Sequence, residues 1–242
     1  METLKIELCA NSVQSIQIAK NLDFDRIELC ENLMQGGITP SAGRIVYALE
    51  QGVETHVLIR PRPGGFNYRE EEVKIMLKDV QICKQLGAQG IVIGILDDFG
   101  AINRSVLDQF IEAAAGMNVT FHRAFDDCVW DWERSMDQLM DAGVNRILTS
   151  GLARNVSTGI SVLKEMVSYA NGRIEIMAGG GVNAGNVGQI VKEVQPDAIH
   201  FSGTVKTVVD ENSLFTESFL AVDEGRVKRI LQAIDQIRSK TY

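Results

Sequence analysis

The tetrapeptide Ile-Glu-Leu-Cys occurs twice near the start of the chain, at residues 6–9 and again at residues 27–30. Each copy has the apolar and β-branched character of a short strand, and each is followed by an amphipathic stretch that predicts a helix, at 12–22 and 41–51. A strand–helix unit that repeats its strand sequence is typical of a chain built from successive similar units. The repeat therefore favours an alternating α/β architecture.

The same alternation continues to the end of the chain. The predicted strands are 6–9, 26–30, 55–59, 90–96, a central stretch 119–126 that begins as a strand, 146–149, 174–178 and 198–202. The remaining predicted helices are 70–86, 104–115, 131–141, 156–170, 186–193 and 224–240. About eight such pairs in 242 residues match the ~250 residues typical of a (β/α)8 TIM barrel. We predict one barrel domain over residues 1–242, with an open doubly wound sheet as the alternative.

Composition excludes several classes of partner. The formal net charge of −8 argues against binding to nucleic acid or to anionic membranes, because phosphate neutralisation needs a basic surface. No signal-peptide pattern and no apolar run of membrane-spanning length is present, so we expect a cytoplasmic protein. The four cysteines form no C-x-x-C pair, and a reducing compartment disfavours a disulfide. Base rates for barrels predict a homodimer.

Strand alternation places an unusual set of ionisable side chains inside the barrel. Residues two apart share a face, and the outward face must be apolar to pack against helices. The predicted inward groups are Glu7, Glu28, Arg60, His122, Glu175 and His200. Buried charges are costly unless they pair or bind a ligand. One interpretation is a salt-bridged plug in which Arg60 and the histidines neutralise the carboxylates. We favour a functional site for the set as a whole.

The central stretch 119–126 ends in the ionisable residues His122, Arg123 and Asp126. The end of a barrel strand is where barrel enzymes place catalytic groups. Glu7 and Glu28 on neighbouring strands suit acid and base roles, because two close carboxylates separate in pKa. His122 suits proton transfer, and the arginines Arg60, Arg62 and Arg123 suit an anionic ligand. The candidate catalytic residues are Glu7, Glu28, Arg60, His122, Arg123, Asp126 and His200.

Glycine-rich turns follow the last three predicted strands. Barrels often bind phosphate through the loops after strands seven and eight, where backbone amides face the ligand. The candidate ligand-binding residues are Arg62, Ser150, Gly151, Gly179, Gly180, Gly181 and Ser202. Tight-turn geometry explains the same glycines equally well, so both interpretations stay open. The long connection 206–222 is either a mobile lid or an extended docked loop.

Cys9 and Cys30 occupy equivalent positions in the two copies of the repeat, so their sulfur atoms are expected to approach one another. Two soft thiolates suit copper(I). The alternative is that both are small buried apolar residues, and spacing alone favours that alternative. A zinc site built from His122, His200 and a glutamate has no recognisable spacing signature.

Several motifs resemble the copper homeostasis protein CutC family. They are Arg26-Ile-Glu-Leu-Cys30, Gly36-Gly-Ile-Thr-Pro-Ser41, Ile59-Arg-Pro-Arg62, Thr120-Phe-His-Arg-Ala-Phe-Asp126, Arg146-Ile-Leu-Thr-Ser-Gly151 and Ile176-Met-Ala-Gly-Gly-Gly-Val182. The resemblance implies a (β/α)8 barrel, a cytoplasmic location, copper tolerance and copper(I) binding. It leads us to expect a copper(I)-binding homeostasis protein with no organic cofactor. The inward ionisable residues support an alternative, a barrel enzyme acting on a small anionic, possibly phosphorylated, molecule by acid/base chemistry.

Overall fold

Eight parallel strands close into a ring in a computed structural model that describes residues 4–129, 131–208 and 218–239. The strands are β1 Lys5–Ala10, β2 Arg26–Leu29, β3 Thr55–Leu58, β4 Gly90–Ile93, β5 Asn118–Phe121, β6 Arg146–Thr149, β7 Glu175–Ala178 and β8 Ala198–Phe201. Each strand pairs with the next one along the chain, and β1 pairs with β8. The predicted (β/α)8 barrel is confirmed.

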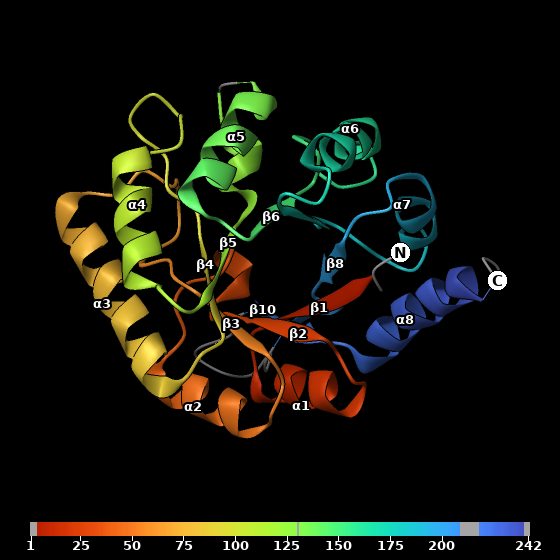
Figure 1. The fold of residues 1–242 in the computed structure, drawn as a ribbon. Helices are drawn as coiled ribbons and strands as arrows, with labels where there is room; N and C mark the ends of the chain where they lie inside the picture. Colours follow the sequence, from red (N-terminus) through yellow and green to blue (C-terminus); the bar gives the residue numbers. More distant parts are fainter. Residues whose placement is uncertain (1–3, 130, 209–217, 240–242) are drawn as a thin grey trace.

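An outer layer of helices surrounds this ring (Figure 1). They are α1 Val13–Asn21, α2 Ala42–Glu50, α3 Glu70–Leu86, α4 Arg104–Ala113, α5 Trp132–Ala142, α6 Ile160–Ala170, α7 Val187–Glu193 and α8 Glu224–Arg238. Local sequence sets their ends: the Ser12 hydroxyl caps α1, and Gly87 ends α3 with a φ of +89°. Arg238 of α8 donates a hydrogen bond to the carbonyl of Leu4, which links the last helix to the segment before β1.

The main apolar core lies between the ring and the helices. Outward strand residues such as Leu8, Ile27 and Ile176 are fully buried there with the apolar faces of the helices. Two much smaller apolar clusters lie inside the ring, one around Leu58 and the other around Leu148. The space between them is left to polar side chains.

The long connection after β8 contains two strands that the sequence did not predict. β9 Thr204–Val208 and β10 Ser218–Val222 pair in antiparallel fashion. The side-chain amide of Asn11, just after β1, donates to the carbonyl of Leu220 at 2.9 Å and fixes β10 to the barrel rim. The prediction of a connection without strands was therefore wrong for residues 204–208 and 218–222. The apolar residues of 218–222 suit a strand. Residues 209–217, the rest of the proposed lid, lie outside the described residues.

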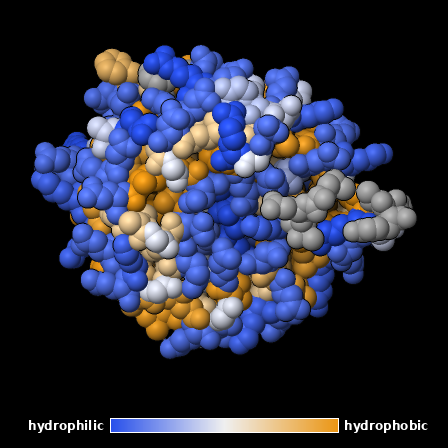
Figure 2. Space-filling model, in the orientation of Figure 1, coloured by the Kyte–Doolittle hydropathy of each residue, from blue (hydrophilic) through white to orange (hydrophobic). Residues whose placement is uncertain are grey.

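Within the described ranges, no helix combines the length and the apolar composition needed to cross a bilayer. Hydrophilic residues gather at the centre of the face shown in Figure 2, over the ring of strands seen in Figure 1. Apolar residues lie to either side of that polar centre.

Candidate functional site

One layer of the barrel interior is a network of buried ion pairs. Arg26 contacts the Glu7 carboxylate directly and lies 3.4 Å from that of Glu175. Arg146 makes a two-pronged interaction with Glu175, with both nitrogen–oxygen distances 2.6 Å. Bidentate pairing offsets part of the cost of removing these charges from water. A salt-bridged plug therefore exists, but Arg26 and Arg146 supply its positive charges in place of Arg60.

The sequence reasoning missed Arg26, Arg146 and His56 as interior residues. Strand parity was the signal that could have found them: Arg26 shares a face with Glu28, and His56 shares a face with Arg60. The His56 ring is fully buried. It fits there because Gly90 has no side chain: a Cβ at Gly90 would lie 2.6 Å from the ring. All three lie at or next to the first residue of a predicted strand, and the parity argument was not extended to those positions.

A cavity of about 290 Å³ opens above this layer, at the carboxyl ends of the strands. Many of the predicted site residues line it, namely Cys9, Glu28, Arg60, His122, Arg123, Gly180, Gly181, His200 and Ser202. They come from β1, β2, β3, β5, β7 and β8 or from the segments that follow these strands. Closure of the ring has thus gathered residues that are up to 193 positions apart in the chain.

Glu28 carries an unsatisfied carboxylate oxygen into this region. Its Oε1 lies 3.9 Å from the Cys9 thiol, whereas its buried Oε2 has no hydrogen-bond partner among the described residues. Burial raises the pKa of Glu28 to about 7; the nearby His200 opposes this rise and Glu7 adds to it. A carboxyl group with a pKa near neutrality can both take and give a proton at physiological pH.

His122 is held as a neutral imidazole with one defined tautomer. Its Nδ1 accepts a hydrogen bond from the backbone N–H of Ala124 at 3.0 Å, so that nitrogen carries no proton. The single ring proton therefore lies on Nε2, which is buried and has no partner among the described residues. Burial and then the charge of Arg60 lower the pKa of His122 to about 3. Gly94 makes room for the ring, because a Cβ there would lie 2.1 Å from Cε1.

Arg60 brings a buried positive charge to the cavity without a carboxylate to balance it. Its guanidinium donates to the carbonyls of Gly37 at 2.7 Å and Gly64 at 2.6 Å, and its carbon lies 5.2 Å from the Phe66 ring centre. Within the described chain it forms no salt bridge, and its buried Nε–H has no acceptor. A buried cation without a counter-ion favours an anionic ligand.

His200 reaches the cavity as the partner of Glu7. Its Nδ1 lies 2.7 Å from Glu7 Oε1, and Arg26 holds the same carboxylate from the other side. Burial opposes the charged imidazole, but the hydrogen bond to Glu7 and the charges of Glu28 and Glu7 outweigh it and raise the pKa of His200. Despite its own burial, the pKa of Glu7 is held far below its usual range by His200 and the arginines. Glu7 is thus a carboxylate that favours the protonated form of its neighbour.

Arg123 and Asp126 form a clamp between the β5 and β6 ends. Asp126 accepts hydrogen bonds from the Thr149 hydroxyl at 2.5 Å and from the backbone amides of Ser150 and Leu152. Arg123 Nε donates to Asp126 at 2.8 Å, and its Nη2 donates to the Ser150 hydroxyl at 2.9 Å. Asp126 therefore positions Arg123, and it is Arg123 that lines the cavity.

Four predicted ligand residues do not line the cavity: Ser150, which contacts Arg123, and also Arg62, Gly151 and Gly179. Arg62 is bound to Glu72 at the start of α3, with Nε–Oε1 at 2.5 Å, so it fixes the loop after β3. The amide of Gly151 donates to the Thr149 hydroxyl at 3.0 Å. At Gly179 a Cβ would lie 2.5 Å from Leu148 Cδ1, so this glycine keeps the lumen open.

Gly180 and Gly181 follow β7 with φ angles of +91° and +89°, a backbone conformation that favours glycine. A Cβ at Gly180 would lie 3.0 Å from the Arg123 guanidinium carbon. Among the described residues, neither amide donates a backbone hydrogen bond outside regular elements. The two amides and Arg123 therefore lie together at one wall of the cavity.

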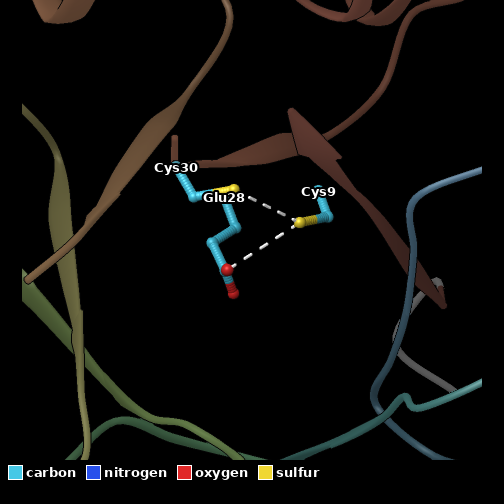
Figure 3. Close-up of side chains that lie close together, drawn as sticks. All are labelled: Cys9, Glu28 and Cys30. Atoms are coloured by element: carbon cyan, nitrogen blue, oxygen red, sulfur yellow. Dashed lines mark hydrogen bonds between the residues drawn. The ribbon is translucent and has the colours of Figure 1, made fainter. Parts of the chain in front are cut away.

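Cys9 and Cys30 approach as the repeat predicts, with their sulfur atoms 3.7 Å apart (Figure 3). Cys9, Glu28 and Cys30 offer ligand atoms that all lie within 4.8 Å of one another. Two thiols of this kind fit the ligand preference of copper(I). Both are buried, however, and the hydrogen bond with Cys30, burial and the charge of Glu28 raise the pKa of the Cys9 thiol well above its usual range. A metal must displace that proton to bind.

The fold and this cavity define a (β/α)8-barrel protein with a cavity lined by ionisable side chains at the carboxyl ends of its strands. The family model described as "CutC family" matches residues 4–205, so the chain belongs to the CutC family. A CutC family protein from Pasteurella multocida is 39% identical over 244 residues, covering 96% of this chain and 100% of that protein. One from Bacteroides fragilis is 46% identical over 204 residues, 84% of this chain and 81% of the relative.

A solved CutC structure from Streptococcus agalactiae, whose name refers to copper homeostasis, superimposes with a TM-score of 0.78. It is 36% identical and covers 82% of this chain and 98% of that chain. The resemblance read from the motifs is confirmed at the level of the family and of the barrel fold.

Proposed function

We propose that this protein is a barrel enzyme that binds a small anionic molecule in the cavity and moves a proton on it. One observation carries the proposal. Three buried polar atoms without partners in the described chain, Glu28 Oε2, His122 Nε2 and Arg60 Nε, belong to residues that line the same cavity. Unsatisfied buried groups are costly, and a bound ligand supplies the missing partners.

The charge of the cavity wall supports an anionic ligand. Arg60 has no carboxylate partner in the described part of the chain, and Glu7 favours the protonated form of His200 by raising its pKa. Glu28, with a pKa of about 7, is only partly ionised at neutral pH. Positive charge therefore exceeds negative charge at the wall. A volume of about 290 Å³ lies at the lower end of the range for small-molecule sites, so the ligand is small.

Thermal stabilisation tests the binding step directly. Inorganic phosphate, 2-phosphoglycolate and malonate are added at neutral pH, and the unfolding temperature is followed. A ligand at 100 times its Kd stabilises the native state by ~2.7 kcal/mol. We expect stabilisation of the wild type that Arg123→Met weakens at least tenfold in Kd and that Arg229→Met, an exposed change on α8, leaves intact. Equal binding by the wild type, Arg123→Met and Arg229→Met would contradict the proposed anion site.

Copper(I) binding is the second candidate, favoured by the 3.7 Å separation of the Cys9 and Cys30 sulfur atoms beside Glu28. In that function the two thiols, once deprotonated, would hold the ion as cargo. The family's association with copper homeostasis is a second reason to test copper(I) binding. The cavity residues other than Cys9 and Glu28 have no role in such a site, which is why we rank it second.

Competition against a copper(I) chelator separates the two candidates. We expect the double variant Cys9→Ala, Cys30→Ala to lose copper affinity by at least a factor of 100 if these thiols are the ligands. Cys83→Ala removes a thiol that is buried in α3 and serves as the matched control. Unchanged copper affinity in the double variant excludes this pair as the site.

A further inference from the structure

We infer that the cavity catalyses proton transfer at a carbon next to a carbonyl group, in a small substrate that carries a phosphate or carboxylate. The inference rests on the proposed anion site and adds the reaction to it. Glu28 is the base, the Nε2–H of His122 is the donor to the carbonyl oxygen, and Arg123 with Gly180 and Gly181 holds the anionic end. Each role follows from the geometry.

The donor is fixed by its own hydrogen bond. Because Ala124 donates to His122 Nδ1, the ring offers a neutral N–H at Nε2, and that N–H has no acceptor in the described chain. A neutral donor stabilises a developing enolate oxygen without handing over its proton at once. The Phe66 ring lies between His122, at 4.8 Å between ring centres, and the Arg60 guanidinium, at 5.2 Å. Arg60 adds a fixed positive charge on the same side.

The base faces the donor across the lumen. Glu28 belongs to β2 and His122 follows β5, and these strands are three apart in a closed ring of eight. Glu28 lines the cavity and its buried Oε2 has no partner in the described chain, so a substrate C–H in the cavity is the partner that we assign to it. Its pKa of about 7 suits removal and return of a proton near neutral pH.

The anionic end is assigned to the wall beyond β7. Asp126 fixes Arg123 through Nε, while Gly180 allows the guanidinium to approach its backbone. Within the described residues, Arg123 Nη1 has no hydrogen bond, and neither do the two glycine amides. A guanidinium beside exposed amides suits a phosphate or carboxylate.

The chemical step balances without a co-reactant. Glu28 takes the proton from the carbon, the C–H electron pair becomes a C=C bond, and the C=O pair moves onto the oxygen, which accepts from His122. The enolate then takes a proton back from Glu28 at the same carbon. When that carbon bears a hydroxyl group, the hydroxyl proton can move to the former carbonyl oxygen, and Glu28 then returns its proton to the neighbouring carbon, which leaves the carbonyl group at the first carbon. The first outcome exchanges hydrogen with solvent, and the second isomerises the substrate.

Hydrogen exchange in heavy water tests the inference. The wild type is incubated with dihydroxyacetone phosphate, glyceraldehyde 3-phosphate and pyruvate, and proton NMR follows the C–H signals beside each carbonyl. We expect enzyme-dependent deuterium incorporation into at least one compound. Glu28→Gln should slow it at least 100-fold, since general base catalysis contributes about 10²–10⁴. Glu112→Gln, an exposed change on α4, should leave the rate unchanged.

The outcomes separate the inference from the proposed anion site. Thermal stabilisation by 2-phosphoglycolate without exchange of any of the three compounds overturns the inference and leaves the anion site standing. Loss of both removes the site as well. Exchange that persists in Glu28→Gln, checked as folded by its circular dichroism and unfolding transition, also overturns the inference because the base would then be another group.

Discussion

Glu7 Oε1 and His200 Nδ1 lie 2.7 Å apart inside the barrel, joined across the seam where the first strand meets the last. Arg26 holds the other oxygen of the Glu7 carboxylate. Glu7 therefore belongs to the ion-pair layer, whereas His200 belongs to the cavity above it. This pair connects the part of the interior that stabilises the barrel with the part that faces a ligand.

The Glu7–His200 pair predicts the titration of His200. With Glu7 present the pKa of His200 is raised, and in Glu7→Gln we expect the pKa to fall, because burial then dominates. The chain has only three histidines, so nitrogen-15 NMR resolves each ring. Glu54→Gln removes the carboxylate charge beside His56 and should leave His200 unaffected. An unchanged His200 titration in Glu7→Gln contradicts this assignment.

The same spectra test the state of His122. We expect its ring to stay neutral from pH 5 to pH 8, with the proton on Nε2, since its pKa is lowered to about 3. A neutral His122 contributes stability that is lost as the pH falls below the unfolded value near 6.5. Titration of this ring near pH 6.5 would falsify the proposed tautomer.

The raised pKa of Glu28 leads us to expect a loss of stability as the pH rises, opposite to the effect of His122. Its folded pKa of about 7 lies above the ordinary 4.5, so its protonated form is stabilising below the lower value. That contribution is lost as the pH rises through about 7, a difference on the order of 3 kcal/mol. We expect Glu28→Gln to be more stable than the wild type at pH 8 but not at pH 4. Urea unfolding at the two pH values measures the difference, and a constant gap between the proteins argues against it.

A substitution at Arg146 tests how much the ion-pair layer contributes to the stability of the fold. Arg146→Met leaves the Glu175 carboxylate with Arg26 at 3.4 Å and the exposed Lys5 at 3.9 Å, and breaking a buried pair in this way costs about 3–5 kcal/mol. Lys228→Met breaks the exposed pair with Glu224 on α8 and should cost under about 1 kcal/mol. Urea unfolding compares the two variants. A loss in Arg146→Met no larger than in the surface control shows that the layer is not stabilising.

The close contact between Gly94 and the His122 ring can be tested by adding a methyl group at Gly94. Gly94→Ala places a methyl group 2.1 Å from His122 Cε1, and we expect it to displace the ring, destabilise the fold by about 1–3 kcal/mol and weaken anion binding. Gly43→Ala in α2 meets no atom within 4 Å and should stabilise the helix by about 0.5–1 kcal/mol. Full ligand affinity in Gly94→Ala counts against a role for His122 in the site.

Much of the site was predictable from strand parity. Glu7, Glu28, Arg60, His122 and His200 all lie inside the barrel, as alternation predicts. Their partners were not predictable, because hydrogen bonding depends on side-chain length and on the neighbouring strand. The salt-bridged interpretation had Arg60 neutralise carboxylates, yet its guanidinium donates to backbone carbonyls. Asp126, a candidate catalytic residue, accepts hydrogen bonds from the loop after β6. The catalytic and binding roles themselves stay predictions.

The sequence by itself determined the alternating architecture and the side of each strand that faces the lumen, because both follow from periodicities of a few residues. Only the tertiary structure decided which charges pair and which remain open. Ring closure brings β8 beside β1 and Glu175 of β7 within reach of Arg26 of β2. Those contacts satisfy Glu7 and Glu175 but leave Glu28, His122 and Arg60 with unsatisfied atoms at the cavity. No local pattern encodes that difference, since it arises from distances across the whole barrel.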